Sequence, residues 1–158
     1  MPKINTFITY NDQAEEAANL YVSIFKNSKI VNLNRYPDEI PGLGGKAMSV
    51  NFELDGQEFL ALNGGPHFTF TDGFSLLVNC ETQTEVDELW SKLTANGGEP
   101  GQCGWLKDKF GLSWQIIPTA LGRLLGDPDP RKSQNVMQAM LQMTKIDVAV
   151  LQRAYDQA

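Results

Sequence analysis

One glutamine stands among apolar residues near the end of the stretch 105–118, which reads WLKDKFGLSWQIIP. The apolar and β-branched residues after the charged turn predict a strand. Because side chains alternate along a strand, Gln115 faces away from Trp114 and Ile116. An amide both donates and accepts hydrogen bonds, so Gln115 could be a metal ligand, a polar group in a binding pocket, or a core amide bonded to backbone. Trp105 begins the stretch and is an aromatic candidate for the wall of such a pocket.

Two further side chains could do acid–base or nucleophilic chemistry. Histidine can serve as a general base, but His67, the only histidine, lies in the Gly- and Pro-rich segment NGGPHFTF, which predicts a surface loop or linker. A cysteine nucleophile needs a neighbour that stabilises its thiolate. Cys103 has only Lys107 close by in the sequence, so we do not expect catalysis there. Cys80 ends a predicted strand, where packing is the favoured interpretation.

The segment PGLGGK at residues 41–46 invites comparison with a phosphate-binding loop. Such a loop needs a Ser or Thr after its lysine to bind magnesium, and a helix N-terminus behind it. Here no hydroxyl residue follows the lysine directly, and a predicted strand follows the loop. We therefore expect a mobile loop over the cavity mouth, with a lid role for residues 37–46 as the alternative.

Composition and charge exclude several classes of protein. With 158 residues, 42% of them apolar and 20% charged, the chain fits one globular domain or two small modules sharing a core. The net charge of −6 disfavours a surface that neutralises phosphates, so no nucleic acid is expected as a partner. No run of about 18 apolar residues predicts a membrane span. The N-terminus MPKINTFITYND lacks a signal sequence and the two cysteines are too few for a disulfide scaffold, so we expect a cytoplasmic protein.

The first half of the chain predicts a strand, a helix and three more strands. The helix follows Asn11-Asp12, which offers an N-cap, and its apolar residues recur at helical spacing. Leu54-Asp55-Gly56-Gln57 has the Asp-Gly signature of a tight hairpin turn. The predicted strands are Ile4–Tyr10, Ser28–Tyr36, Lys46–Glu53 and Glu58–Leu62.

The same order of elements begins again after a break at residues 63–66. Thr82 or Thr84 caps the second helix, and a shift of 69 residues aligns Tyr21 in the first helix with Trp90 in the second. This repetition predicts an internal duplication of a β-α-β-β-β unit. Each unit alone exposes one face of a four-stranded sheet, so the two must pack together or exchange partners. The strands predicted in the second half are Phe74–Cys80, a segment near Glu99–Gln102, Gly104–Leu106 and Leu112–Ile117.

Beyond Pro118 the sequence predicts helices only. A short helix over Ala120–Leu125 comes first; then Asp129 caps a second helix, with Pro130 in its first turn. The methionine-rich face of that helix is typical of one that packs on a sheet, with an adaptable ligand groove as the alternative. A last helix covers roughly Asp147–Tyr155. The predicted fold class is α+β, a single domain with one module at about 3–63, a second at about 73–118 and a helical extension at about 119–158.

Four stretches resemble the PhnB-like branch of the vicinal oxygen chelate superfamily: FITYNDQAEEAANLYVSIF, LALNGGP, GWLKDKFGLSWQIIP and DPDPRKSQNVMQAML. That superfamily includes glyoxalase I, the extradiol dioxygenases and the bleomycin-resistance proteins. Members of this branch are often labelled 3-demethylubiquinone-9 3-methyltransferase-like. The resemblance runs from Lys3 to about Leu151. It implies two β-α-β-β-β modules whose mixed sheets form a cup around a pocket, and a homodimer.

Metal-using members of the superfamily take one ligand from the first strand and one from the last strand of each module. Matching those strands places Asn5, Ala61, Ser75 and Gln115 at the four ligand positions. This set contains no imidazole and no carboxylate, so it would hold zinc, nickel or iron poorly. The resemblance therefore implies a pocket with neither metal nor cofactor, in which Asn5, Ser75 and Gln115 form a neutral polar floor beside Trp105.

The favoured functional hypothesis is metal-free binding of a small molecule in this pocket, with or without catalysis. Two alternatives stay open. The protein could be an enzyme, either a relative of the glyoxalases and dioxygenases or a methyltransferase as the family label suggests, although no Gly-rich turn between a strand and a helix predicts a nucleotide-like cofactor. It could instead sequester a drug as bleomycin-resistance proteins do, which the acidic charge balance would allow.

Overall fold

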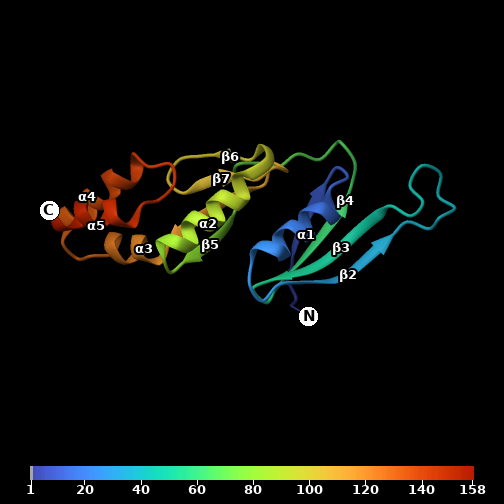
Figure 1. Cartoon of the computed structure of the whole chain (residues 1–158), viewed down its shortest axis with the longest axis horizontal. Helices are drawn as coiled ribbons and strands as arrows, with labels where there is room; N and C mark the ends of the chain where they lie inside the picture. The colour runs from blue at the N-terminus through green and yellow to red at the C-terminus, as the bar shows by residue number, and fades with distance from the viewer. Residues whose placement is uncertain (1) are drawn as a thin grey trace. The chain divides into compact units, whose positions relative to one another are not determined.

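A computed structural model describes residues 2–158 (Figure 1). The chain divides into two compact units, the first ending at Thr69 and the second beginning at Phe70. Each unit contains a four-stranded sheet, and the two sheets have the same strand topology. The α+β fold with two β-α-β-β-β modules and C-terminal helices is confirmed.

The first unit is a mixed sheet covered on one face by a helix. Its strands are arranged in the order β1-β4-β3-β2, with β1 parallel to β4 and the other pairs antiparallel. Asp55 and Gly56 have φ of +50° and +79°, as the predicted tight turn requires. The elements are β1 Thr6–Tyr10, α1 Ala14–Ile24, β2 Lys29–Arg35, β3 Ala47–Leu54 and β4 Gln57–Asn63.

The core of the first unit lies between α1 and this sheet. Every second residue of the central strands packs under the helix, where Tyr21 is fully buried. The ring of Phe52 stacks on that of Phe59 at 5.4 Å between centroids. Figure 1 shows α1 running across the strands.

The N-terminus of α1 differs from the prediction. Asn11-Asp12 does not cap it: the residue before the helix is Gln13, whose side chain makes no capping hydrogen bond. The acceptor comes from the last strand of the unit, where Asn63 Oδ1 accepts from the backbone N–H of Ala14 at 2.8 Å. Asn63 Nδ2 also donates to the Ala47 carbonyl at 3.1 Å, so one amide joins the helix, β3 and β4. A partner this far along the chain leaves no local signal in the sequence.

The second unit repeats the arrangement. Its strand order is β5-β8-β7-β6, again with one parallel pair, β5 and β8. Helix α2 begins at Gln83, 69 residues after the first residue of α1, which matches the predicted shift. Thr82 is confirmed as its cap, accepting from the Glu85 backbone N–H at 3.2 Å. The elements are β5 Leu76–Cys80, α2 Gln83–Thr94, the short 3-10 helix Ala95–Gly97, β6 Glu99–Pro100, β7 Trp105–Lys107 and β8 Ser113–Pro118.

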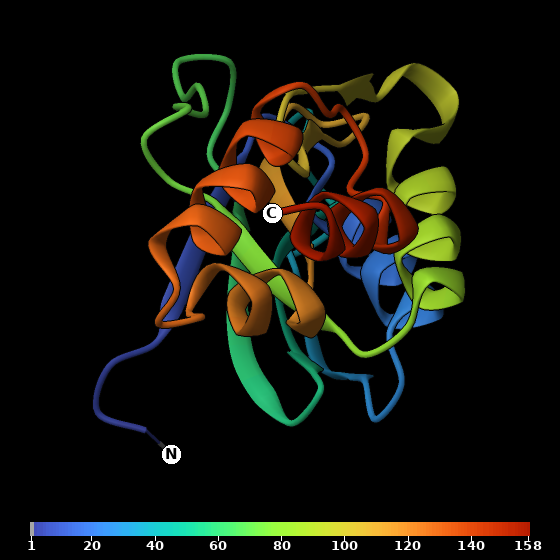
Figure 2. The same ribbon diagram turned by 90° about the vertical axis from the view of Figure 1, so that its left-hand side faces the viewer.

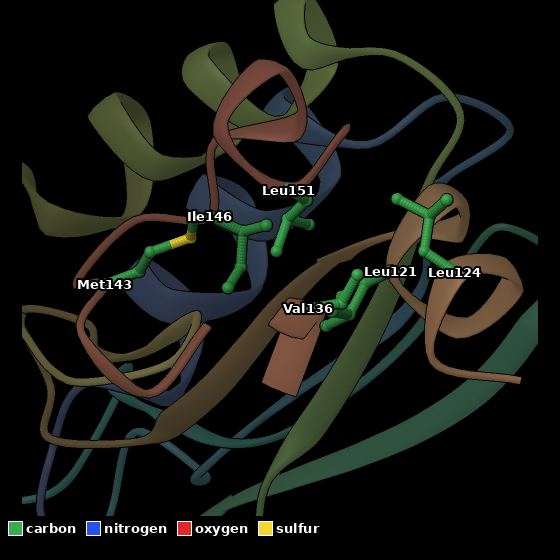
Figure 3. Packing of buried hydrophobic residues seen from close by; sticks show 6 residues of the cluster. All are labelled: Leu121, Leu124, Val136, Met143, Ile146 and Leu151. Atoms are coloured by element: carbon green, nitrogen blue, oxygen red, sulfur yellow. The ribbon is translucent and has the colours of Figure 1, made fainter. Parts of the chain in front are cut away.

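Three C-terminal helices complete the second unit: α3 Thr119–Leu125, α4 Pro130–Leu141 and α5 Val148–Asp156. They lie together as one group, orange to red in Figure 2. The predicted cap is confirmed, since Asp129 Oδ1 accepts from the Arg131 backbone N–H at 2.9 Å. Figure 3 shows the apolar cluster that holds the group together, formed by Leu121, Leu124, Val136, Met143, Ile146 and Leu151.

The methionine-rich face of α4 packs mainly on other helices, whereas we expected it to pack on a sheet. Its neighbours are α3 and α5, against which Val136 is fully buried and Met140 is partly buried. Met137 is 41% exposed. Helices that follow the last strand can bury their apolar faces on one another, and the periodicity of a single helix does not reveal which partner covers it.

Candidate functional site

One face of the second sheet carries the candidate site. Gln115 on β8 lies opposite Leu77 of β5 on one side and Trp105 of β7 on the other, so the three side chains share a face. The other face packs under α2 and buries Trp114 and Ile116, which are 2% and 0% exposed. The predicted alternation around Gln115 is thus confirmed, and its side chain points away from the helix-covered core.

The amide of Gln115 is paired with a hydroxyl on this face. Gln115 Nε2 donates to Ser75 Oγ at 3.0 Å. Ser75 lies immediately before β5, two residues ahead of Leu77, which places both on the same side. The structure therefore brings together three of the four residues proposed as ligand-binding: Ser75, Trp105 and Gln115.

A cavity of about 450 Å³ lies at the β6–β7 edge of the sheet, and neither Ser75 nor Gln115 is among its lining residues. Trp105 connects the cavity to this pair, because it faces Gln115 in the strand register and also lines the cavity. All the lining residues belong to the second unit. They are Asp72, Glu99, Pro100, Gly101, Gln102, Cys103, Trp105, Leu106, Lys107 and Ser113.

Charged groups of both signs border the cavity. Lys107 Nζ lies 3.0 Å from Asp72 Oδ1, which joins the loop before β5 to strand β7. The hydrogen bond from Lys107 to Asp72 raises the pKa of the ammonium group, and Glu99, opposite Lys107 in the strand register, adds to the effect. The ammonium group therefore stays charged throughout the neutral range, and two carboxylates share the rim with it.

The turn that leads from β7 into β8 is fixed by a buried carboxylate. Asp108 is 2% exposed, and its Oδ1 accepts from the backbone N–H groups of Phe110 and Leu112 at 2.9 and 3.1 Å. Its Oδ2 accepts from the indole Nε1–H of Trp114 at 2.9 Å. The sequence suggested an ordinary charged turn, but Asp108 is a structural anchor that sets the two strands on either side of the site.

Asn5 lies in the first unit, ahead of β1. Its Nδ2 donates to the Pro2 carbonyl at 3.0 Å, and its Oδ1 is buried with no hydrogen-bond partner among the described residues. Its membership in a shared polar floor with Ser75 and Gln115 stays a prediction.

The placement of Ala61 at a ligand position is wrong. Ala61 is 1% exposed and lies opposite Ile8 and Val50, on the face of the first sheet that α1 covers. The neighbouring residues Leu60 and Leu62 point to the other face. A displacement of one residue along a strand reverses the direction of every side chain, which is how an alignment of strands alone misplaced this position.

The remaining candidates take structural or surface positions. His67 is exposed in the loop after β4. Burial raises the pKa of the Cys80 thiol to about 12, with a further contribution from the nearby Glu85 charge, so this cysteine is unreactive at neutral pH. Cys103 lines the cavity with a positive φ of 57°, in the left-handed region that only a few non-glycine residues adopt.

The positions that the resemblance assigns to metal ligands do not fit a metal ion here. Asn5, Ser75 and Gln115 offer only amide and hydroxyl oxygens, and neither a carboxylate nor an imidazole stands at any of these three positions. Within residues 2–158 no group of three or more His, Cys, Asp or Glu side chains is arranged to hold a metal. We therefore derive no chemistry through a metal at these positions.

Sequence reasoning missed the charged rim of the cavity. Lys107 could have been found, because it lies two residues after Trp105 and so shares its face. Asp72 comes from the loop before β5, and Gln102 from the loop before β7; neither loop has a periodicity that would place its side chains.

The family model for 3-demethylubiquinone-9 3-methyltransferase matches residues 2–117, which is most of the chain. The chain belongs to this family. Among solved structures, a putative 3-demethylubiquinone-9 3-methyltransferase, PhnB protein, from Bacillus cereus is 38% identical, with the match covering 75% of this chain and 100% of that chain at a TM-score of 0.69. The duplicated sheets of this PhnB-like protein have the vicinal oxygen chelate fold.

More distant structures share the fold alone. Protein PA1353 from Pseudomonas aeruginosa is 17% identical over 75% of this chain and 98% of its own, with a TM-score of 0.60. The product of an Arabidopsis thaliana gene is 13% identical over 74% and 98%, with a TM-score of 0.51. A comparison with proteins of curated function gave no match.

The family name implies a methyl donor. The strand-to-helix turns of the PhnB-like chain do not fit a nucleotide-like donor well. The two turns, Asn11–Gln13 and Glu81–Thr82, contain no glycine and form no loop that would let a nucleotide-like cofactor approach the backbone. The family model also ends at residue 117, so helices α3, α4 and α5 lie outside it. Within the described residues, no helix is both long and apolar enough to cross a membrane.

Proposed function

We propose that this PhnB-like protein binds a small organic molecule, without a metal, in the cavity beside Trp105. The observation that carries the proposal is the cavity of about 450 Å³, a volume that suits a small-molecule ligand, lined by Trp105, which lies opposite Gln115 in the strand register. Trp105 offers an aromatic surface, and the amide of Gln115 still has its acceptor oxygen for a polar group of the ligand.

Charged groups at the rim of the cavity could orient the ligand through hydrogen bonds. The Lys107 ammonium can turn from Asp72 toward an acceptor on the ligand, and Glu99 can accept from a donor. A molecule with a flat apolar part and one or two polar groups matches this combination. These side chains can bind the ligand and orient it without a metal. We therefore propose binding as the primary activity.

We further propose that the chain acts as one vicinal oxygen chelate-like domain, forms a homodimer and works in the cytoplasm. Leu77, 51% exposed beside Gln115, is an apolar side chain that a second copy could cover. Sedimentation velocity at micromolar concentration tests the dimer. A single species of the monomer mass at all concentrations would contradict it.

A thermal-shift and native mass spectrometry screen tests the binding proposal. The panel contains organic metabolites, divalent metal ions and S-adenosylmethionine as separate arms. We expect at least one metabolite to bind with 1:1 stoichiometry per chain, and Gln115→Ala to weaken it by roughly tenfold, the cost of one or two hydrogen bonds. Gln138→Ala, the same substitution at an exposed position on α4, serves as the matched control.

Each arm of the screen can also refute the proposal. Tight stoichiometric binding of a divalent metal that Gln115→Ala abolishes would replace it with a metal site. Saturable binding of S-adenosylmethionine would favour the methyltransferase that the family name describes. Preferential binding of bulky cationic drugs over metabolites would favour sequestration, to which the net charge of −6 is suited.

A further inference from the structure

The wall of the cavity formed by residues 101–104 is attached to the C-terminal helices. The backbone N–H of Cys103 donates to the Met143 carbonyl at 2.8 Å, and that of Gly104 donates to the Thr144 carbonyl at 2.8 Å. Both acceptors lie in the α4–α5 connection, residues 142–147, which is outside the matched part of the family. This connection therefore supplies the hydrogen-bond partners for a loop that lines the candidate site.

The α4–α5 connection is itself fastened to the start of α2. Gln83 Nε2 donates to the Ile146 carbonyl at 3.0 Å, while its Oε1 accepts from the Val148 backbone N–H at 2.8 Å. The Lys145 ammonium pairs with Asp87, one turn further along α2, at 2.7 Å. A side chain that both donates to and accepts from one segment fixes its position and its orientation.

Close packing completes the attachment. A Cβ atom added at Gly104, which has a φ of +86°, would lie 3.1 Å from Ile146 Cγ1 and 2.9 Å from Ile117 Cδ1. Ile146 is fully buried and lies next to Leu151 in the cluster of Figure 3. The glycine is thus required by its backbone conformation and by close contacts with both β8 and the side chain of the connection.

We propose that the α4–α5 connection positions the Cys103 wall of the cavity. Cys103 stands in the left-handed region, which a non-glycine residue keeps only when its surroundings enforce it. The two carbonyl acceptors and the Ile146 contact are the part of those surroundings that the connection supplies, beside the bonds that join residues 101–104 to Trp105 and β8. The C-terminal helices then determine the shape of the cavity, and the consequence for ligand selection rests on the binding function proposed above.

Thiol alkylation of the full-length protein tests the positioning without any ligand. Cys103 lines the cavity whereas Cys80 is fully buried, so the ratio of their iodoacetamide labelling rates, read by peptide mass spectrometry, separates local release of the wall from general unfolding. We expect Gln83→Ala to raise the rate of iodoacetamide labelling at Cys103 at least fivefold and to leave Cys80 unlabelled. Gln138→Ala is the matched control.

A second pair of variants tests the same positioning by adding a methyl group at a packed glycine and at an unpacked one. Gly104→Ala is expected to change Cys103 labelling in the same way. Gly97→Ala, also at a positive φ but with no atom within 4 Å of an added Cβ, should leave the labelling as in the wild type. Tryptophan fluorescence confirms that each variant is folded.

The labelling rates decide the positioning, and the binding data decide the function. Wild-type rates at Cys103 in both Gln83→Ala and Gly104→Ala would overturn the proposal, as would equal acceleration at Cys80. If the wild type binds a ligand from the screen, Gln83→Ala should lower its affinity at least fivefold, and an unchanged affinity would overturn the role in selection. A wild type that binds nothing would refute the proposed function alone.

Discussion

Replacing Asp108 with asparagine should strongly destabilise the second unit. The substitution keeps the shape of the side chain and its Oδ1, which accepts from Phe110 and Leu112. It places an NH₂ group where Oδ2 accepted from the indole of Trp114, so two donors face each other in a region where Asp108 is 2% exposed.

The expected cost follows from these three bonds. A hydrogen bond to a charged group contributes roughly 1 kcal/mol more than one to a neutral group, which removes about 2 kcal/mol from the two backbone bonds. The indole N–H left without an acceptor adds about 1–3 kcal/mol. We therefore expect Asp108→Asn to lower the free energy of unfolding by about 3–5 kcal/mol.

Urea denaturation followed by tryptophan fluorescence measures this change directly. All three tryptophans, Trp90, Trp105 and Trp114, lie in the second unit, so the signal reports that unit and not the first. Asp72→Asn is the matched control, because the same substitution there removes an ion pair whose carboxylate is 80% exposed. Exposed pairs contribute about 0–1 kcal/mol.

The reasoning about Asp108 would be refuted by a loss of less than about 1 kcal/mol, no larger than that of the control. A double-mutant cycle with Trp114→Phe sharpens the test. Because the indole and the carboxylate share one hydrogen bond, the two substitutions should cost less together than the sum of their separate effects.

Three further predictions concern other parts of the chain. Iodoacetamide at pH 8 should label Cys103 and not Cys80, whose pKa of about 12 leaves a negligible thiolate fraction; equal labelling would contradict the burial of Cys80. The Tyr155 hydroxyl donates to Asp127 Oδ2 at 2.6 Å and lowers the pKa of that carboxyl. This hydrogen bond therefore stabilises the folded state above the unfolded carboxyl pKa near 4, and the stabilisation is lost as the pH falls. Tyr155→Phe should therefore lower Tm at pH 7 and have less effect at pH 2; a pH-independent difference would refute the pairing. Asn63→Ala should lower the free energy of unfolding by about 1–3 kcal/mol, measured by far-UV circular dichroism because the first unit has no tryptophan. Asn51→Ala, opposite Leu60 on the face of the first sheet that α1 does not cover, is the control.

The duplication was predictable because it rests on local patterns that occur twice. The spacing of apolar residues in each helix, the Asp55-Gly56 turn and the caps at Thr82 and Asp129 are all interactions between near neighbours in the sequence. Periodicity also placed Gln115 and Trp105 on one strand face, since alternation along a strand needs no knowledge of the rest of the fold.

The predictions that failed concern residues whose partners are distant in the sequence, or a strand register that the alternation of side chains does not determine. Asn63 caps a helix that begins 49 residues earlier, so the local candidates Asn11-Asp12 appeared sufficient. Ala61 was misplaced because an alignment of β4 tolerates a shift of one residue. The structural role of Asp108 in the charged turn was not predicted, because only the fold shows that the Trp114 indole reaches its carboxylate.

A single NMR titration tests the central claim most directly. The three tryptophan indole N–H signals separate in an ¹H–¹⁵N spectrum, and only Trp105 lines the cavity. Adding a molecule found in the screen should shift the Trp105 signal progressively to saturation at one equivalent and leave Trp90 and Trp114 in place. Saturable binding that leaves the Trp105 signal unchanged would contradict a ligand site in this cavity.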